Sequence, residues 1–235
     1  MSTIRALAAP QAHAKLEAFT FDPGPLGDEQ VEIDVQYCGI CHSDLSMLHN
    51  EWHITRYPFV PGHEAVGTVS AVGRSAKLVG PGQTVGLGWN AGSCMSCPPC
   101  LAGDHNMCRV LEQTIVGRHG AFATRVRCHW SWATPIPPAL DPSAAGPLFC
   151  GGITVFNPLV QHNVRPTDRV GVIGVGGSAA LRRDHGIQSA GAAPRAAHGP
   201  RGRDRNRRVG PHGAAIPQQM GLRRNRVHQF GRQGG

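Results

Sequence analysis

The chain has 235 residues and a mass of 25.0 kDa, which allows one large domain or a domain and part of a second. Its formal net charge of +8 is uneven, because residues 1–177 hold 11 Lys+Arg against 13 Asp+Glu whereas residues 178–235 hold 12 Arg against 2 Asp. No apolar run is long enough to cross a bilayer and the N-terminus lacks a signal-peptide core, so we expect a soluble, cytoplasmic protein without membrane contact.

Three stretches predict the strands of a first domain. Residues 29–36 alternate apolar and polar side chains, as a half-buried strand does. Residues 65–73 and 83–89 are rich in Val and punctuated by Gly. Together they predict a compact β-barrel-like domain with long loops.

The chain changes character between residues 134 and 177. Prolines punctuate the first part, Asp141 stands where it can cap a short helix, and a helical stretch begins at Gly151. The apolar run "RVGVIGV" (169–175) is typical of a buried parallel strand. A second structural unit is therefore predicted to begin here.

Four cysteines lie within fifteen residues in the order C-x2-C-x2-C-x7-C: Cys94, Cys97, Cys100 and Cys108. Four thiolates at this spacing can close a tetrahedron around Zn²⁺ with no open position, which predicts a structural zinc site. Disulfides or a redox-active C-x-x-C pair are the alternatives, but neither uses the third and fourth thiols well.

A second set of candidate ligands is dispersed over "YCGICHSDL", "PGHEAVG" and "GPLFCGG". Cys41, His63 and Cys150 would supply two sulfurs and one imidazole and leave a fourth zinc position for water or substrate, which is catalytic in kind. Taken singly, a buried Cys is more often a small hydrophobe and a lone His a satisfied polar group.

The motifs "CGICHSDL", "YPFVPGHEAVGTVSAVG" and "SCMSCPPCLAGDHNMC" occur in an order and spacing that resemble the zinc-dependent alcohol dehydrogenases of the medium-chain family. The chain is most similar to their cinnamyl-alcohol-dehydrogenase-like aldehyde reductases, over about residues 4–177. The resemblance implies a mixed α/β protein, with a GroES-like β-barrel catalytic domain followed by the start of a Rossmann domain.

The resemblance also implies roles for single residues. Cys41, His63 and Cys150 would ligate a catalytic zinc, with Glu64 as an occasional fourth ligand or water partner. Ser43 would relay a proton from the alcohol and His42 would face the cofactor pyrophosphate.

Three positions near this site have alternatives or depart from the family. Asp44 is expected either to anchor the zinc site from behind or to cap the following helix, and Ser43 could instead be a solvent-facing turn residue. Ser46 stands where close relatives carry His, which weakens the outer part of their proton relay. Cys38 and Cys128 are predicted to be buried or free thiols, and His119 receives no role.

A glycine turn follows the predicted parallel strand. Gly174, Gly176 and Gly177 begin a pyrophosphate-binding fingerprint for NADP or NAD, although the third glycine of G-x-G-x-x-G is replaced by Ala179. The residues that follow offer neither an apolar helix nor another buried strand. The Rossmann crossover is therefore not completed by this sequence.

Residues 178–235 are rich in Arg, Gly, Pro and His, and their composition predicts disorder. A shift of one nucleotide lets "RNRVHQFG" (224–231) and "LRRDHGI" (181–187) encode segments typical of the family, so we expect this tail to be read out of frame. Nucleic-acid binding through the Arg-rich tail is the weaker interpretation, since the tail has no aromatic interleaving or known module.

The sequence thus predicts residues 1–150 as a GroES-like zinc-binding domain, 151–177 as the beginning of an NAD(P)-binding domain and 178–235 as the tail. The implied function is zinc-dependent interconversion of small alcohols and aldehydes with NADP(H) or NAD(H), impaired or absent in this chain. The alternative is a non-enzymatic zinc-binding remnant. We expect a homodimer only if the cofactor domain is intact.

Overall fold

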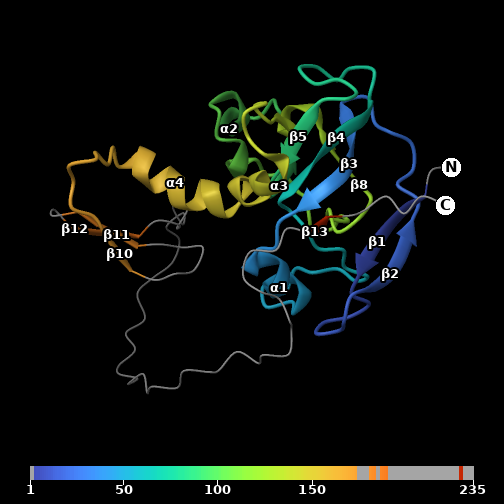
Figure 1. The fold of residues 1–235 in the computed structure, drawn as a ribbon, viewed down its shortest axis with the longest axis horizontal. Coiled ribbons are helices and arrows are strands. Elements are labelled where there is room, and N and C mark those ends of the chain that lie inside the picture. Colours follow the sequence, from blue (N-terminus) through green and yellow to red (C-terminus); the bar gives the residue numbers. More distant parts are fainter. Residues whose placement is uncertain (1–2, 174–179, 184–185, 190–227, 230–235) are drawn as a thin grey trace.

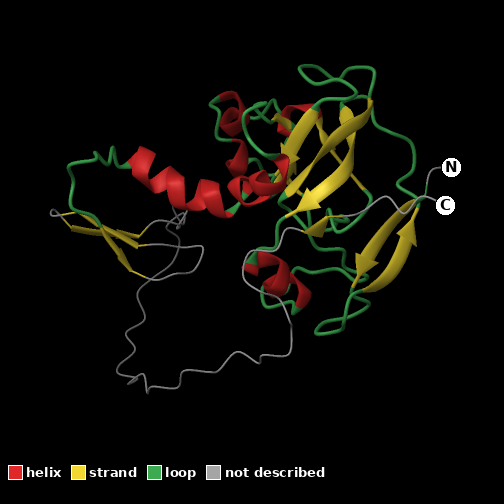
Figure 2. Cartoon of the chain, in the orientation of Figure 1, coloured by secondary structure: helices red, strands yellow, loops and turns green. Residues whose placement is uncertain are grey.

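A computed structural model describes residues 3–173, 180–183, 186–189 and 228–229 (Figures 1 and 2). The predicted turn glycines Gly174, Gly176 and Gly177, and most of the Arg-rich tail, lie outside the described residues. Within the described part, no single helix is long and apolar enough to span a membrane, and one bent pair, Pro142–Phe149 with Gly151–Gln161, passes that test by length and composition alone.

The described strands are β1 (Ile4–Ala8), β2 (Glu17–Phe21), β3 (Gln30–Cys38), β4 (Ala65–Val72), β5 (Thr84–Leu87), β6 (Asn90–Gly92), β7 (Glu112–Gln113), β8 (Arg125–His129), β9 (Thr134–Pro135), β10 (Gly171–Ile173), β11 (Ala180–Arg183), β12 (Gly186–Ser189) and β13 (His228–Gln229). The α-helices are α1 (His42–Leu48), α2 (Pro98–Leu101), α3 (Pro142–Ala145) and α4 (Gly151–Gln161). Three 3-10 helices, η1 (His105–Met107), η2 (Trp130–Trp132) and η3 (Gly146–Phe149), complete the described elements.

A six-stranded antiparallel sheet forms the centre of the molecule (Figure 1). Its order is β13-β3-β4-β5-β9, and β8 also pairs with β3. The three strands predicted from alternation and Val content are found as β3, β4 and β5. A separate hairpin of β1 and β2 is attached through bridges from Ala6 to Ala123 and from Ala9 to Phe59.

The main core lies on one face of the large sheet. It contains buried aliphatic side chains from four of the strands, including Val31, Ile33, Val69, Val85 and Val126. Burying these side chains contributes on the order of 2 kcal/mol each to folding, which fixes the register of the strands from which the site loops extend.

Glu32 is the exception to the alternation of β3, because its side chain is buried and charged. Its two carboxylate oxygens accept hydrogen bonds from Arg125 (2.6 Å) and Arg127 (2.7 Å) on β8. Arg127 also donates to the carbonyls of residues 23, 24 and 25. The carboxylate therefore joins β3, β8 and the loop that precedes β3.

The helices predicted after residue 140 are both present. Asp141 caps α3, since its carboxylate accepts a hydrogen bond from the backbone N–H of Ser143 (2.9 Å). Helix α4 begins at Gly151, as expected, and extends away from the sheet towards β10 (Figure 1).

Strand β10 differs from the sequence prediction. It was expected to be a buried parallel strand, but Val170 and Gly171 are exposed and β10 pairs antiparallel with β11. Strands β11, β12 and β13 also lie in the tail, where the composition predicted none. The physical reason is that the backbone of a strand needs hydrogen-bond partners, and a segment joined by a short connection can supply them only in the antiparallel direction.

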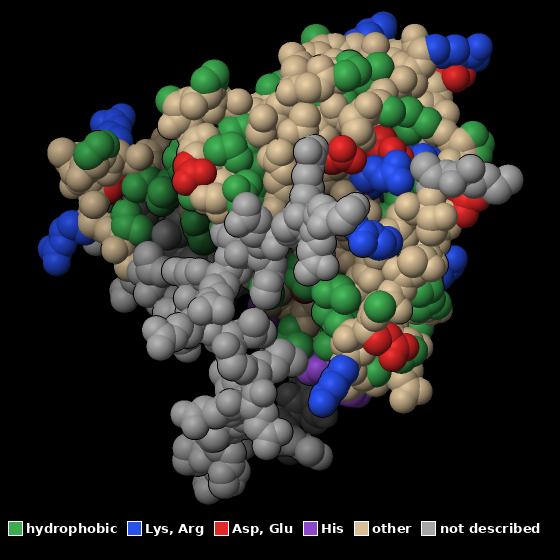
Figure 3. All heavy atoms as spheres, turned by 45° about the vertical axis from the view of Figure 1, so that its right-hand side comes forward, with side chains coloured by type: hydrophobic (Ala, Val, Ile, Leu, Met, Phe, Trp, Pro, Cys, Tyr) green, Lys and Arg blue, Asp and Glu red, His purple; other side chains and the backbone are tan. Residues whose placement is uncertain are grey.

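On the face of the described residues that Figure 3 shows, charged side chains of both signs are dispersed. This dispersal agrees with the nearly balanced charge of residues 1–177.

Candidate metal centres and pocket

The structure brings Cys41, His63, Glu64 and Cys150 together from three distant segments. Cys41 is the N-cap residue of α1, the pair His63 and Glu64 directly precedes β4, and Cys150 lies between η3 and α4. One ligand atom from each lies within 4.8 Å of those of the others, and the Cys41 and Cys150 Sγ atoms are 3.8 Å apart. We call these four residues the pocket site.

Asp44 lies behind the pocket site and holds it in place. Its carboxylate accepts hydrogen bonds from the backbone N–H groups of Cys41 (3.0 Å) and Gly62 (2.8 Å) and lies 2.9 Å from Nδ1 of His63. It is thus the N3 residue of the capping box of α1 rather than the N-cap. The Asp44 side chain therefore has both of the expected kinds of contact, because it supports the start of α1 and also orients the imidazole of His63.

Two glycines allow close approach of the ligand-bearing segments. A Cβ on Gly39 would overlap the carboxylate of Glu64, and a Cβ on Gly86 would overlap the ring of Phe149, the residue before Cys150. Neither position has room for a side chain, so both glycines permit the convergence of the site.

The electrostatics of the pocket site favour the metal-binding protonation state of one ligand, Cys41, whereas the hydrogen bond with Cys41 and burial raise the pKa of Cys150. The hydrogen bond from Cys150, opposed by burial and supported by His63 and Ser43, lowers the pKa of Cys41 to about 3. Burial and the nearby Cys41 raise the pKa of Glu64 to about 7. Cys41 is therefore a thiolate at neutral pH, which is the form that binds metals.

His63 has one ring nitrogen that still needs a partner. The ring is fully buried, and Nε2 makes no hydrogen bond while Nδ1 faces Asp44. Although burial favours the neutral ring, Asp44 and Cys41 raise the pKa of His63 to about 10. A buried nitrogen beside two sulfurs fits a zinc ion, for which imidazole and thiolate are the usual ligands.

The pocket site opens on a cavity of about 500 Å³. Cys150 and Ser43 form part of its lining, and the remaining wall includes three tryptophans: Trp52, Trp89 and Trp132. Trp89 packs edge-on against His63, with ring centroids 5.0 Å apart, and against Trp52 at 5.9 Å. The cavity therefore joins an apolar aromatic wall to the candidate metal ligands, as substrate pockets commonly do.

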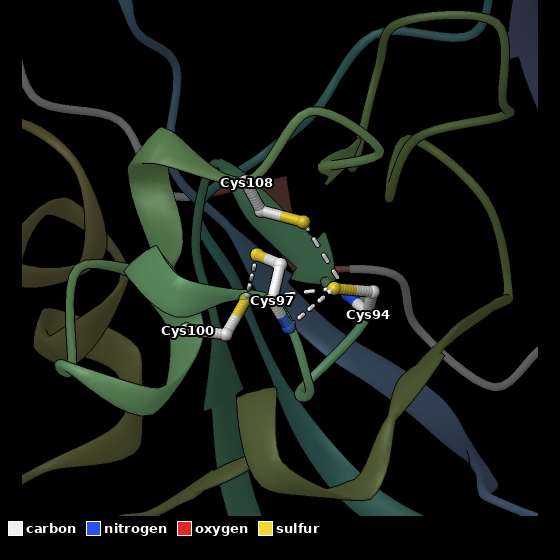
Figure 4. A group of neighbouring side chains, drawn as sticks. All are labelled: Cys94, Cys97, Cys100 and Cys108. Atoms are coloured by element: carbon white, nitrogen blue, oxygen red, sulfur yellow. Dashed lines mark hydrogen bonds between the residues drawn. The ribbon is translucent and has the colours of Figure 1, made fainter.

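The four clustered cysteines also converge, in a loop that we call the cysteine lobe (residues 93–111). Figure 4 shows Cys94, Cys97, Cys100 and Cys108 with their sulfurs facing one another, and these lie within 4.8 Å. The sulfur of Cys97 is 3.4 Å from that of Cys100, and all eight cysteines of the chain are free thiols. The disulfide alternative is therefore not realised in this structure.

Backbone N–H groups point at the sulfurs of the cysteine lobe. The N–H of Cys97 donates to Cys94 Sγ (3.3 Å) and the N–H of Cys94 donates to Cys108 Sγ (3.5 Å). The backbone groups of Ser96 and Cys97 lower the pKa of Cys94 to about 6. Four sulfurs that converge in this way, with no carboxylate among them, fit a closed structural zinc site.

The other residues singled out in the sequence are placed as follows. His42 is exposed at the first turn of α1 and lies outside the cluster of ligands. Cys38 and Cys128 are fully buried, and burial raises the pKa of both thiols. Ser46 is buried in α1, and His119 packs against Phe19 and Phe21.

The aromatic lining of the pocket was missed by the sequence analysis. Trp52, Trp89 and Trp132 come from three separate segments of the chain, and no local pattern marks them as neighbours. The position of Trp89, at the end of the predicted strand 83–89, was the one available signal.

Comparison with known proteins shows which family the chain resembles. Residues 27–138 match the alcohol dehydrogenase GroES-like domain family. The chain is 55% identical over 174 residues to aldehyde reductase AdhA of Synechocystis sp., covering 74% of this chain and 52% of that protein. It is 40% identical over 179 residues to cinnamyl alcohol dehydrogenase 7 of Arabidopsis thaliana, covering 73% and 50%.

Solved structures agree with these sequence matches. A cinnamyl alcohol dehydrogenase of Sorghum bicolor superposes with a TM-score of 0.71 at 35% identity, over 75% of this chain and 53% of that one. A cinnamyl alcohol dehydrogenase of Helicobacter pylori in complex with NADP(H) gives 0.66 at 27% identity, over 69% and 49%. The chain thus spans about half the length of the relatives that it matches, and its residues 27–138 belong to the alcohol dehydrogenase GroES-like domain family.

Proposed function

We propose that the pocket site binds a zinc ion and positions the oxygen of a small alcohol or aldehyde, as the substrate half of an NADP(H)- or NAD(H)-dependent oxidoreductase. The observation that carries the proposal is the juxtaposition of a Cys41, His63 and Cys150 ligand set with an aromatic-walled cavity of about 500 Å³. A zinc ion with an open position polarises a carbonyl and acidifies an alcohol.

The side chains around the site have distinct proposed roles. Ser43 lines the cavity beside Cys41, so its hydroxyl is placed to accept the proton of an alcohol. His42 is exposed at the start of α1, from which it would carry that proton to solvent and contact the cofactor pyrophosphate. Glu64 is the occasional fourth ligand or water partner, and its raised pKa allows it to hold a proton near neutrality.

The cysteine lobe is proposed to hold a second zinc with a structural role. Its four sulfurs leave no position for substrate, and the apolar side chains of Leu101, Met107 and Val110 in the same lobe are exposed rather than packed in a core. The cofactor is NADP or NAD, and the complex of the Helicobacter pylori relative with NADP(H) favours the former.

We further propose that hydride transfer is impaired or absent in this chain. The described strand β10 enters an antiparallel arrangement with β11, whereas a dinucleotide-binding unit continues through a helix to a parallel strand. The same observation favours the second candidate, a zinc-binding remnant without enzymatic activity.

Binding and turnover separate these proposals. Zinc-loaded protein should bind cinnamaldehyde, measured by quenching of tryptophan fluorescence, because three of the four tryptophans line the cavity. His63→Ala should weaken this binding at least tenfold, and His53→Asn, at an exposed position with φ of 57°, is the matched control. Equal binding with and without zinc would reject the pocket-site proposal.

The enzymatic part is tested by mixing the purified chain with cinnamaldehyde and NADPH or NADH. Consumption of cofactor above the protein-free rate would exclude the remnant interpretation. Zinc-dependent binding without turnover is the result expected for this chain.

A further inference from the structure

The aromatic wall of the pocket touches the cysteine lobe. Trp132 lies at the end of η2 and lines the cavity, and its indole packs edge-on against the ring of His105 in η1, with centroids 5.7 Å apart and planes at 79°. His105 belongs to the cysteine lobe, three residues before Cys108. Trp132, in the wall of the pocket, therefore packs directly against the cysteine lobe.

A hydrogen-bond chain continues from His105 to the cysteines. Nδ1 of His105 lies 3.2 Å from the hydroxyl of Ser93, and the Sγ of Cys100 lies 3.5 Å from the same hydroxyl. Ser93 directly precedes Cys94 in the chain. The His105 imidazole is therefore held by the hydroxyl of Ser93, which lies next to Cys94 in the chain and close to the sulfur of Cys100.

A second, covalent connection runs beside the first. Strand β6 (Asn90–Gly92) contributes Asn90 to the pocket lining, contacts η2, and leads directly into Ser93. A shift of the cysteine lobe would therefore move two residues of the pocket wall, Asn90 and Trp132.

Trp132 depends on these contacts for its position. It sits in a three-residue 3-10 helix, and its indole Nε1 is buried without a hydrogen-bond partner. No polar contact within the described residues holds the ring, so its position is set by packing against the main core and against the ring of His105 in the cysteine lobe. Of these contacts, the one with His105 is the one that can respond to the state of the lobe.

We propose that His105 is a positioning residue which, held by Ser93 beside the four cysteines, fixes Trp132 in the wall of the substrate pocket and so couples the metal state of the cysteine lobe to substrate affinity. The part that concerns substrate rests on the function proposed above. The part that concerns Trp132 does not, because it follows from contacts between the lobe and the tryptophan.

The expected size of the effect follows from ordering one side chain. If the Trp132 indole is mobile, the ligand must immobilise it on binding. This cost weakens binding about three- to tenfold relative to a protein in which the indole is already fixed.

The first experiment follows Trp132 without substrate. Near-UV circular dichroism is recorded for zinc-free and zinc-loaded protein in the His63→Ala background, where the pocket site has lost a ligand, and the spectrum of the same protein with Trp132→Phe is subtracted. We expect the Trp132 signal to change on zinc loading and this change to fall by at least half with His105→Ala. Leu101→Ala, an exposed position on the same lobe, should leave it unchanged.

The second experiment measures substrate affinity in the chain with both sites intact. His105→Ala should raise the dissociation constant of cinnamaldehyde three- to tenfold, and Leu101→Ala should not. Zinc content is measured for every variant by atomic emission. Ser93→Ala serves as the second variant if His105→Ala loses the ion, because it removes the hydroxyl and keeps both rings, and it should lower the Trp132 response in the same direction.

The two experiments fail differently. The coupling would be overturned if the circular dichroism signal of Trp132 did not change on zinc loading. It would also be overturned if the change were the same in the unsubstituted lobe and in the His105→Ala and Ser93→Ala variants. Failure of the unsubstituted protein to bind cinnamaldehyde would instead reject the proposed function, while the circular dichroism result would still decide the coupling.

Discussion

One carboxylate, that of Asp44, faces three groups from two segments: the backbone N–H of Cys41, the backbone N–H of Gly62 and Nδ1 of His63. The side chain is buried, so each of these contacts is made away from competing water. The orientation of two candidate zinc ligands therefore depends on one residue that is not a ligand.

Asp44→Asn should weaken zinc binding at the pocket site ten- to a hundredfold. An amide keeps the shape of the side chain but removes the charge and one acceptor, and the partners of metal-bound histidines typically have effects of this size. Competition with a chromophoric chelator measures the affinity. Zinc at the cysteine lobe is the internal control and should be unaffected; equal affinity at the pocket site would show that Asp44 only supports the helix.

His119 gives a prediction for pH. Burial lowers the pKa of its imidazole, and its Nδ1 is buried without a partner beside Phe19 and Phe21. Because the folded pKa lies below the unfolded value of about 6.5, the stability of the fold is complete above that pH and falls as the pH drops through it. His119→Gln should reduce this loss, measured as the difference in free energy of unfolding between pH 7 and pH 5; an identical loss in both proteins would contradict it.

At the scale of elements, the site is built where loops leave the antiparallel sheet. The N-cap of α1, the segment before β4, and the junction of η3 with α4 each deliver one ligand. The junction of η3 with α4 is held against the sheet by Phe149, whose ring packs against Gly86 of β5. Contact between a strand and a 3-10 helix thus sets the position of Cys150.

Gly86→Ala should therefore damage the pocket site from a distance. The added methyl group overlaps the Phe149 ring, and such overpacking costs about 1–3 kcal/mol. We expect a loss of stability of this size in urea unfolding together with at least tenfold weaker zinc binding at the pocket site. Gly80→Ala is the matched control, since a Cβ there meets no atom within 4 Å; if both variants behaved alike, the seating of Phe149 would not matter.

Glu32 tests the joint between strands β3 and β8. Glu32→Gln leaves the two arginines of β8 facing a neutral group in a buried position, which typically destabilises a protein by about 3 kcal/mol. Asp28→Asn breaks the exposed pair with Arg74 and should cost less than about 1 kcal/mol. Urea unfolding of the two variants measures both values, and similar losses would contradict the role given to burial.

Much of this arrangement could be predicted from local sequence. Alternation and Val content identified β3, β4 and β5, the capping pattern at Asp141 identified α3, and cysteine spacing identified the lobe. The aromatic wall could not be predicted, because Trp52, Trp89 and Trp132 are brought together only by tertiary packing. The antiparallel pairing of β10 was missed for a related reason: strand direction is set by the partner, and an apolar run does not reveal its partner.

At the scale of the molecule, the cavity at the pocket site adjoins the cysteine lobe. The pocket site opens on a cavity whose lining includes Asn90 and Trp132, and both contact the part of the chain that leads into or belongs to the cysteine lobe. The domain boundaries at residues 150 and 177 stay predictions, as does the out-of-frame origin of the tail, most of which lies outside the described residues.

The central claim is that this chain holds two zinc ions in two separate sites. The most direct test is the zinc content of the purified chain, measured by atomic emission beside the variants His63→Ala and Cys97→Ser. We predict two zinc ions per chain for the unsubstituted protein and one for each variant. Two ions retained in His63→Ala, or fewer than two in the unsubstituted protein after loading with zinc, would contradict the account.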